Sequence, residues 1–184
     1  MSTLNGRLEG GDLRWKTPLQ GLLAGASYLD QDLHIRATIQ SFSYSASSTH
    51  DETSQFYVQY IRDKLTLDGE YRRNLLDLAQ FSLNSRSAYG SASYRISKRL
   101  EFGTYYARFY LDLRANSSGP SSHIFEKVVT ARVDLTNHWD VKLEGHFMHG
   151  YAASDAFRGF DPIDNPQGLK PTTNLLVIRT GVQF

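Results

Sequence analysis

The sequence predicts an all-β fold, an antiparallel up-and-down β-barrel that crosses a membrane with about eight to nine strands. Three observations support this prediction. Apolar and polar residues alternate over many segments, short and long connections follow one another in turn, and 11 Tyr and 10 Phe accompany abundant Ser, Thr and Gly. A membrane-spanning helix is excluded, because the longest uninterrupted apolar stretch, residues 175–178, is far shorter than the ~20 residues that such a helix needs.

Strict alternation marks a strand with two different faces, because successive side chains point to opposite sides of a sheet. The clearest cases are residues 64–73, 125–135 and 139–151. In the last of these, Val141 and its apolar neighbours alternate with charged residues such as Lys142. The same pattern is weaker in six further segments, so that nine strand candidates result: residues 4–15, 21–30, 54–62, 86–96, 100–112 and 173–184.

Three positions interrupt the alternation. Lys127 lies on the apolar side of its segment, near an end from which a lysine can reach the membrane interface. Continuing the register of residues 100–112 puts Arg108 on the apolar side, so we expect a β-bulge there. The alternation also shifts phase at Gly10 and Gly11, where we expect a second bulge.

The connections between the candidates come in two lengths. Tight links are predicted at residues 17–20, 62–64, 97–99 and 136–138, and long polar loops at residues 31–53, 74–85, 113–123 and 150–172. Short turns on one side and long loops on the other are typical of outer-membrane barrels, in which the turns are periplasmic and the loops extracellular.

The chain is predicted to form one domain, residues 1–184, because its length suits a single unit. Nine candidates is an odd number, whereas a complete single-chain barrel normally has an even number of strands. Either the chain is the carboxy-terminal part of a larger barrel, or residues 4–15 are not a wall strand and eight strands follow from Gly21. We favour the first interpretation, which also accounts for the lack of a recognisable secretory signal at the amino terminus.

The charged side of the alternating segments is predicted to face a water-filled lumen. Charges of both signs stay hydrated there and set ion selectivity through a transverse field. The alternative is the solvated outer face of a soluble sheet, which shows the same alternation. The residues predicted to line the pore are Asp68, Glu70, Arg72, Arg95, Glu101, Glu126, Arg132, Asp134, Asp140, Lys142, Glu144 and Arg179.

Large aromatic residues near strand ends on the apolar side are predicted to form interfacial girdles. An amphipathic ring suits the boundary between lipid tails and headgroups, where one end is apolar and the other wet. Ordinary packing within a sheet is the alternative for any one of them. The candidates are Trp15, Tyr28, Tyr60, Tyr71, Tyr94 and Trp139.

The last segment ends on an aromatic residue and keeps the alternation, with one face formed by Leu176, Ile178, Thr180, Val182 and Phe184. It resembles the assembly signal of bacterial outer-membrane barrels, which the barrel-assembly machinery binds; Val182 departs from it, since an aromatic residue often stands there. Residues 164–174 resemble the last long loop and strand entry of general or phosphate-selective porins, and residues 15–28 are more loosely similar.

The resemblance to the bacterial outer-membrane porin family implies a location in the outer membrane, contact with the lipid bilayer and lipopolysaccharide, and possible homotrimers. Passive diffusion of small hydrophilic solutes or ions through a polar lumen is the function that we expect. Two alternatives remain at this point. One is a small eight-stranded barrel with a structural, adhesive or lipid-binding role, and the other is a soluble β-sandwich or lectin-like binding module.

Catalysis, cofactors and metals are not expected. His146 and His149 are three residues apart, which sends them to opposite faces of a strand, and no spacing marks a nucleophile with its base. The loop residues Asp155, Asp161, Asp164 and Asn165 could offer oxygen ligands to calcium, but they lack the spacing and the Glu of a calcium loop, and a polar loop is the interpretation that we favour. The net charge of +1 and the absence of a basic aromatic surface give no reason to expect nucleic acid as a partner.

Overall fold

The computed structural model describes residues 2–39, 42–78, 82–112, 119–152 and 170–182. In these ranges the chain forms strands, turns and one short 3-10 helix, η1 (Pro120–Ser122). No helix in the described ranges has the length and apolar character needed to cross a membrane. The strands are β1 (Ser2–Lys16), β2 (Leu22–Ile39), β3 (Phe42–Arg62), β4 (Leu65–Leu78), β5 (Ser82–Arg95), β6 (Leu100–Tyr110), β7 (His123–Asp134), β8 (Trp139–His149) and β9 (Thr172–Val182).

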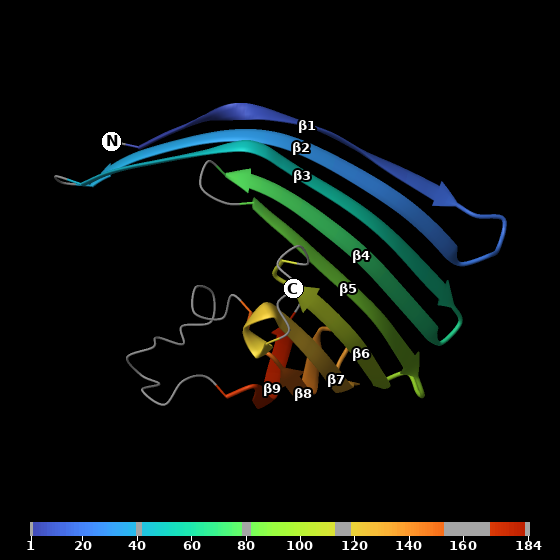
Figure 1. Ribbon diagram of the computed structural model, residues 1–184. Helices are drawn as coiled ribbons and strands as arrows, with labels where there is room; N and C mark the ends of the chain where they lie inside the picture. Colours follow the sequence, from blue (N-terminus) through green and yellow to red (C-terminus); the bar gives the residue numbers. More distant parts are fainter. Residues whose placement is uncertain (1, 40–41, 79–81, 113–118, 153–169, 183–184) are drawn as a thin grey trace.

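The nine strands form one antiparallel sheet in which each strand pairs with the next along the chain, from β1 to β9. Figure 1 shows this sheet as a curved trough. The predicted all-β, up-and-down architecture is therefore confirmed. β1 is a wall strand with a full ladder to β2, so the interpretation in which eight strands begin at Gly21 is wrong. In the described ranges no ladder joins β1 to β9, and the sheet has two edges.

Tight turns connect the strands at one end of the trough, as predicted, at residues 17–21, 63–64, 96–99 and 135–138. Two turn residues have a left-handed backbone, Asp63 with φ 53° and Gly21 with φ 86°. A Cβ atom at Gly21 would collide with the carbonyl oxygen of Ile61. Glycine is the residue that this conformation and this close approach of backbone both favour.

Two of the predicted long loops are wrong, because the strands continue through most of them. β2 and β3 pair as far as Ile39 and Phe42, with a register shift between Gln31 and His34, and β4 and β5 pair as far as Asp77 and Ser82. The alternation breaks in residues 74–78, where Leu75 and Leu76 put apolar side chains on both faces, while the backbone ladder persists. Residues 32–39 keep an alternation in the sequence, with Leu33, Ile35 and Ile39 between polar residues. Alternation records which faces meet water, not whether the backbone pairs. The loops at 113–123 and 150–172 fall largely outside the described residues.

The two predicted bulges are also wrong. The ladder between β1 and β2 runs one to one past Gly10 and Gly11, and the β6 ladders show no shift at Arg108. The phase change at the two glycines reflects a change of surroundings along an unbroken strand. Arg108 keeps its place on the apolar side because its guanidinium carbon lies 5.0 Å from the ring centroid of Tyr106 and 5.9 Å from that of Phe125.

Candidate functional site

The register of the ladders places all twelve predicted pore-lining residues on one face of the sheet. This face is the concave one, because its side chains crowd one another: Asp140 is 15% exposed and Glu144 18%. The opposite, convex face presents apolar residues that are far more exposed, including Leu176 at 66% and Ile178 at 70%. The alternation in the sequence thus corresponds to a polar inner face and an apolar outer face.

One ladder row across β5 to β9 holds four cations and one carboxylate, in the order Arg95, Glu101, Arg132, Lys142 and Arg179. Neighbouring carboxylates compensate them. Arg95 lies 3.1 Å from Glu101, and its Nη1 donates to Asp134 at 2.7 Å. Arg132 pairs with Asp134 at 2.9 Å. These contacts join β5, β6 and β7 through side chains as well as through backbone hydrogen bonds.

The turn-side end of this network includes Asp140, which lies 3.6 Å from Arg132 and keeps its Oδ2 buried without a hydrogen-bond partner in the described ranges. A polar hollow of about 410 Å³ opens here, lined by Arg132, Asp134 and Asp140 together with residues of the two adjoining turns. The arrangement leaves acceptor capacity at one end of the trough, where water or a polar solute can satisfy it.

A second ionic chain lies further along β7 and β8. Lys142 Nζ is 2.7 Å from Glu144, and His146 Nδ1 is 2.8 Å from Glu126. His146 Nε2 lies 3.9 Å from Glu144. The predicted set of pore-lining residues omitted His146. The alternation of residues 139–151 nevertheless places it on the same side as Asp140, Lys142 and Glu144. Within β5 to β9 the described carboxylates of the concave face therefore each have a cationic or imidazole neighbour.

The concave face of β1 to β4 is different. A hollow of about 590 Å³ is lined there by Asp12, Arg14, Tyr57, Asp68 and Glu70, with amide and hydroxyl side chains between them. Asp12 accepts hydrogen bonds from Arg14 Nε at 2.6 Å and from the Tyr57 hydroxyl at 2.9 Å. The sequence prediction missed Asp12, Arg14 and Tyr57, because the phase shift in β1 concealed which side they face.

Asp68 and Glu70 of β4 form no ion pair within 4.0 Å in the described ranges. Asp68 accepts hydrogen bonds from Gln59 at 2.8 Å and from Ser91 at 3.4 Å. Arg72 of the same strand forms no ion pair in these ranges either. Unlike the network of β5 to β9, this part of the face offers negative charge to whatever occupies the trough.

A glycine fixes the position of Tyr57. Gly25 pairs with Tyr57 across β2 and β3, and the tyrosine ring lies against it, in the space where a Cβ atom would otherwise be. The ring is therefore held across β2, with its hydroxyl on Asp12 of β1. A glycine in a strand interior often marks such a close approach.

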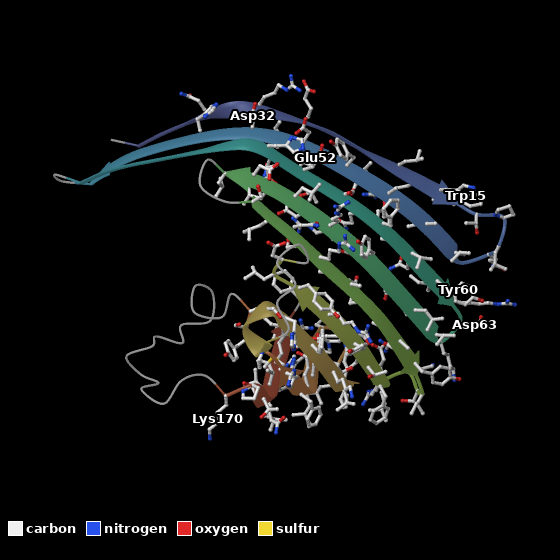
Figure 2. The ribbon with its side chains drawn as sticks, in the orientation of Figure 1. Trp15, Asp32, Glu52, Tyr60, Asp63 and Lys170 are labelled. Atoms are coloured by element: carbon white, nitrogen blue, oxygen red, sulfur yellow. The ribbon has the colours of Figure 1, made fainter. Side chains whose placement is uncertain are left out.

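The predicted girdle residues all lie on the convex face. Trp15, Tyr60, Tyr94 and Trp139 stand at or near the turn-side ends of their strands, and Figure 2 shows Trp15 and Tyr60 at that end of the trough, with Glu52 nearer the other end. Tyr28 and Tyr71 each lie six residues from the turn-side ends of β2 and β4. Two aromatic levels thus border an apolar band.

The residues of the predicted assembly signal share the convex face of β9 as far as the structure describes them: Leu176, Ile178, Thr180 and Val182. Phe184 lies outside the described residues, as do Asp155, Asp161, Asp164 and Asn165. In the described ranges no group of three metal-ligating side chains gathers. His146 and His149 do fall on opposite faces, and the second contacts His123 on the convex side, with their ring nitrogens 3.0 Å apart.

A single curved, up-and-down antiparallel sheet with an apolar convex face has the fold of an outer-membrane β-barrel. Comparison with solved structures agrees. The chain is similar to a NanC porin structure over 100% of its own length and 99% of that chain, with a TM-score of 0.51 and 9% identity. At so low an identity this similarity defines the fold alone.

Two further solved structures are similar at lower TM-scores. The anion-selective porin from Comamonas acidovorans matches 76% of this chain at a TM-score of 0.49 and 11% identity, and the chain spans 48% of its length. OmpT of Vibrio cholerae, an outer membrane protein in a form lacking loop L8, matches 94% of this chain at 0.47 and 8% identity, with 62% of its own length covered. No family model and no curated protein sequence matches the chain.

Proposed function

We propose that this chain forms part of the wall of an outer-membrane channel. Small hydrophilic solutes or ions diffuse passively through this channel along the concave face of the sheet. One observation carries the proposal: in β5 to β9 the ion pairs and carboxylates of the described ranges occupy one face of the sheet, while the other face exposes large apolar side chains such as Val129 at 57% and Phe147 at 53%. Hydrocarbon is the solvent that suits such a convex face, and water is the one that suits the concave face.

A membrane-spanning wall must close, because an unpaired backbone group in hydrocarbon costs several kcal/mol. The outward edges of β1 and β9 therefore require further strands, either from the same protein or from another copy. If the chain is the carboxy-terminal part of a larger barrel, as the odd number of strands favours, further strands of the same protein pair with these edges. The trimer implied by the resemblance to porins remains part of the proposal.

The charges of the concave face favour cations. Asp12, Asp68 and Glu70 line one hollow with a single guanidinium, that of Arg14, which is engaged with Asp12. The ion pairs of β5 to β9 largely cancel one another. The two carboxylates of the hollow without an ion pair in the described ranges, Asp68 and Glu70, raise the local concentration of cations and lower that of anions.

The test is conductance in a planar lipid bilayer that separates two salt concentrations. The proposal predicts stepwise currents and a reversal potential of the sign given by cation preference. Replacing Asp68→Asn together with Glu70→Gln shifts the reversal potential toward that of a non-selective pore. The matched control, Glu9→Gln with Glu52→Gln, removes the same charge from the convex side and leaves the potential unchanged. A bilayer without current steps contradicts the proposal.

A soluble β-sandwich needs a second layer packed on the apolar face. The described ranges contain one sheet, and the apolar residues of its convex face are exposed. A small barrel with a structural, adhesive or lipid-binding role remains as the second candidate function. Such a barrel fills its lumen with side chains, so it inserts into the bilayer but carries no current.

A further inference from the structure

Four cations stand together on the convex face, where the apolar band ends. Arg73, Arg86, Arg108 and Lys127 belong to β4, β5, β6 and β7, and each is seven to nine residues from the turn-side end of its strand. In these strands the convex residues nearer the turns are uncharged. We call these four residues the outer basic cluster.

The members of the cluster lie at one depth. Eight residues of strand span about 26 Å at ~3.3 Å per residue, which a strand tilt of about 40° reduces to ~20 Å along the membrane normal. An outer-membrane barrel has an apolar band about 25 Å tall. The turn-side ends mark one border of this band, so the cluster stands near the opposite border, where lipid headgroups begin. Tyr71 and Tyr106, six residues from the same ends, lie just inside it.

Two of the cations face each other directly. Arg73 and Arg86 are cross-strand partners in the β4–β5 ladder, an arrangement of like charges that destabilises a sheet unless something neutralises it. Arg73 Nε donates to the amide oxygen of Asn84 at 3.0 Å, a neutral partner. Arg86 Nε is buried and has no hydrogen-bond acceptor in the described ranges.

Carboxylates do not neutralise the cluster. Among the described side chains, none forms an ion pair within 4.0 Å with any of its four members. Glu52, on the same face of the neighbouring β3, lies 2.8 Å from His50 Nε2 instead. Arg108 is held by Tyr106, to whose hydroxyl its Nε donates at 2.9 Å. Positive charge is therefore concentrated and available at this level.

The same level of β1 to β3 has the opposite character. Glu9, Asp30 and Glu52 project from the convex face there, accompanied by Arg7, which lies 3.1 Å from Glu9. The basic character is thus confined to β4 through β7 and is not a general property of the rim. Localised cations beside an exposed apolar surface suit a ligand that has both an anionic group and hydrocarbon chains.

We propose that the outer basic cluster binds the phosphate groups of an anionic lipid headgroup, with the acyl chains of that lipid lying along the apolar band below. Arginine suits this ligand, because its planar guanidinium can donate two parallel hydrogen bonds to a phosphate. A phosphate between Arg73 and Arg86 neutralises their repulsion and offers an acceptor to the buried Arg86 Nε. The proposal rests on the part of the proposed function that places the convex face in lipid.

The test uses the full chain in nanodiscs of zwitterionic phosphatidylcholine, titrated with diphosphorylated lipid A while bound lipid is counted by native mass spectrometry. The double variant Arg73→Gln, Arg86→Gln is expected to bind about 30-fold more weakly, since each basic residue near a membrane surface contributes ~1 kcal/mol. The control Arg72→Gln, Arg179→Gln removes the same charge from the concave face and keeps the wild-type affinity. Equal affinities for all three proteins, or an equal loss in the control, overturn the proposal.

Two further arms make the outcome specific. The variant Arg73→Lys, Arg86→Lys keeps the charge but loses the paired donors, so an affinity between those of the wild type and the glutamine variant is expected; it also carries the test if the glutamine variant does not fold. Lipid A without phosphates is expected to bind no better to the wild type than to the variants. Displacement of lipid A by equimolar inorganic phosphate contradicts a lipid site, because the hydrocarbon then contributes nothing.

The lipid site and the channel fail separately. Because the outer basic cluster faces away from the lumen, Arg73→Gln with Arg86→Gln is expected to leave single-channel conductance unchanged. If the wild-type protein binds lipid A but carries no current, the lipid-site proposal stands and the channel proposal is overturned. If it conducts but binds lipid A no better than the glutamine variant, the channel proposal stands and the lipid-site proposal is overturned.

Discussion

The two faces of β7 and β8 share one backbone but differ in what their side chains contact. On the concave face Lys142, Glu144, His146 and Glu126 form a chain of polar contacts between 2.7 and 3.9 Å long. On the convex face, residues between them in sequence such as Leu143 stand 44% exposed without polar partners. The difference teaches that each strand has one face suited to lipid and one suited to water. The same substitution made at two adjacent residues of a strand should therefore have very different effects.

The largest effect is expected from placing charge on the convex face. Val129→Lys puts an ammonium group within the apolar band, five residues from the turn-side end of β7, and should lower the free energy of unfolding from a bilayer by about 2–4 kcal/mol. Its neighbour Thr130 faces the concave side, across from Glu144. Thr130→Lys should cost less than about 1 kcal/mol.

Urea unfolding of both variants in liposomes measures this contrast. Equal destabilisation by the two substitutions contradicts the assignment of the faces, because then both positions have the same surroundings.

A smaller effect is expected from crowding the concave face where Tyr57 crosses Gly25. Gly25→Ala introduces a Cβ into the space of the tyrosine ring and should destabilise the protein by about 1–3 kcal/mol, the usual range for overpacking. Gly11→Ala is the matched control, since nothing lies within 4 Å of its added Cβ. The same unfolding assay separates them, and a Gly25→Ala protein as stable as the Gly11→Ala protein shows that Tyr57 does not occupy that place.

The smallest effect is expected within the ion-pair network. Arg95→Met removes the partner that joins Glu101 to Asp134, but its side chain is 35% exposed and water screens the charges left behind. We therefore expect a loss of about 1 kcal/mol or less. Arg72→Met, which breaks no ion pair of the described ranges, should be neutral. A double-mutant cycle of Arg95 with Asp134 checks the prediction, and a coupling energy well above 1 kcal/mol contradicts it.

Alternation in the sequence was sufficient to predict the strands and their faces near the turns. Residues 139–151 and 64–73 carry charged and apolar residues in strict order because the two faces meet different solvents there. The turns at residues 62–64 and 136–138 were equally visible, since the alternation stops abruptly on both sides of them. All twelve predicted lining residues accordingly share one face.

The same signal was not sufficient further from the turns. Residues 31–53 are rich in Ser, Thr and charged residues, and residues 74–85 place Leu75 and Leu76 in succession, so both stretches resembled loops although the backbone remains paired. The site residues Asp12 and Tyr57 were missed for a related reason. Their roles depend on contacts across three strands, which only the register defines. Arg108 suggested a bulge because one of its two aromatic neighbours, Phe125, belongs to β7 and is brought beside it only by the register.

The most direct test of the whole account is the accessibility of single spin labels along β8 in a phospholipid bilayer. The chain has no cysteine, so a cysteine can be introduced at each position from 140 to 145 in turn and labelled. We predict that labels at 141, 143 and 145 collide with oxygen, which is concentrated in lipid, and that labels at 140, 142 and 144 collide with a water-soluble nickel complex. Low accessibility to both reagents at 141 and 143 would mean that the apolar face is packed against protein, which contradicts a lipid-facing wall.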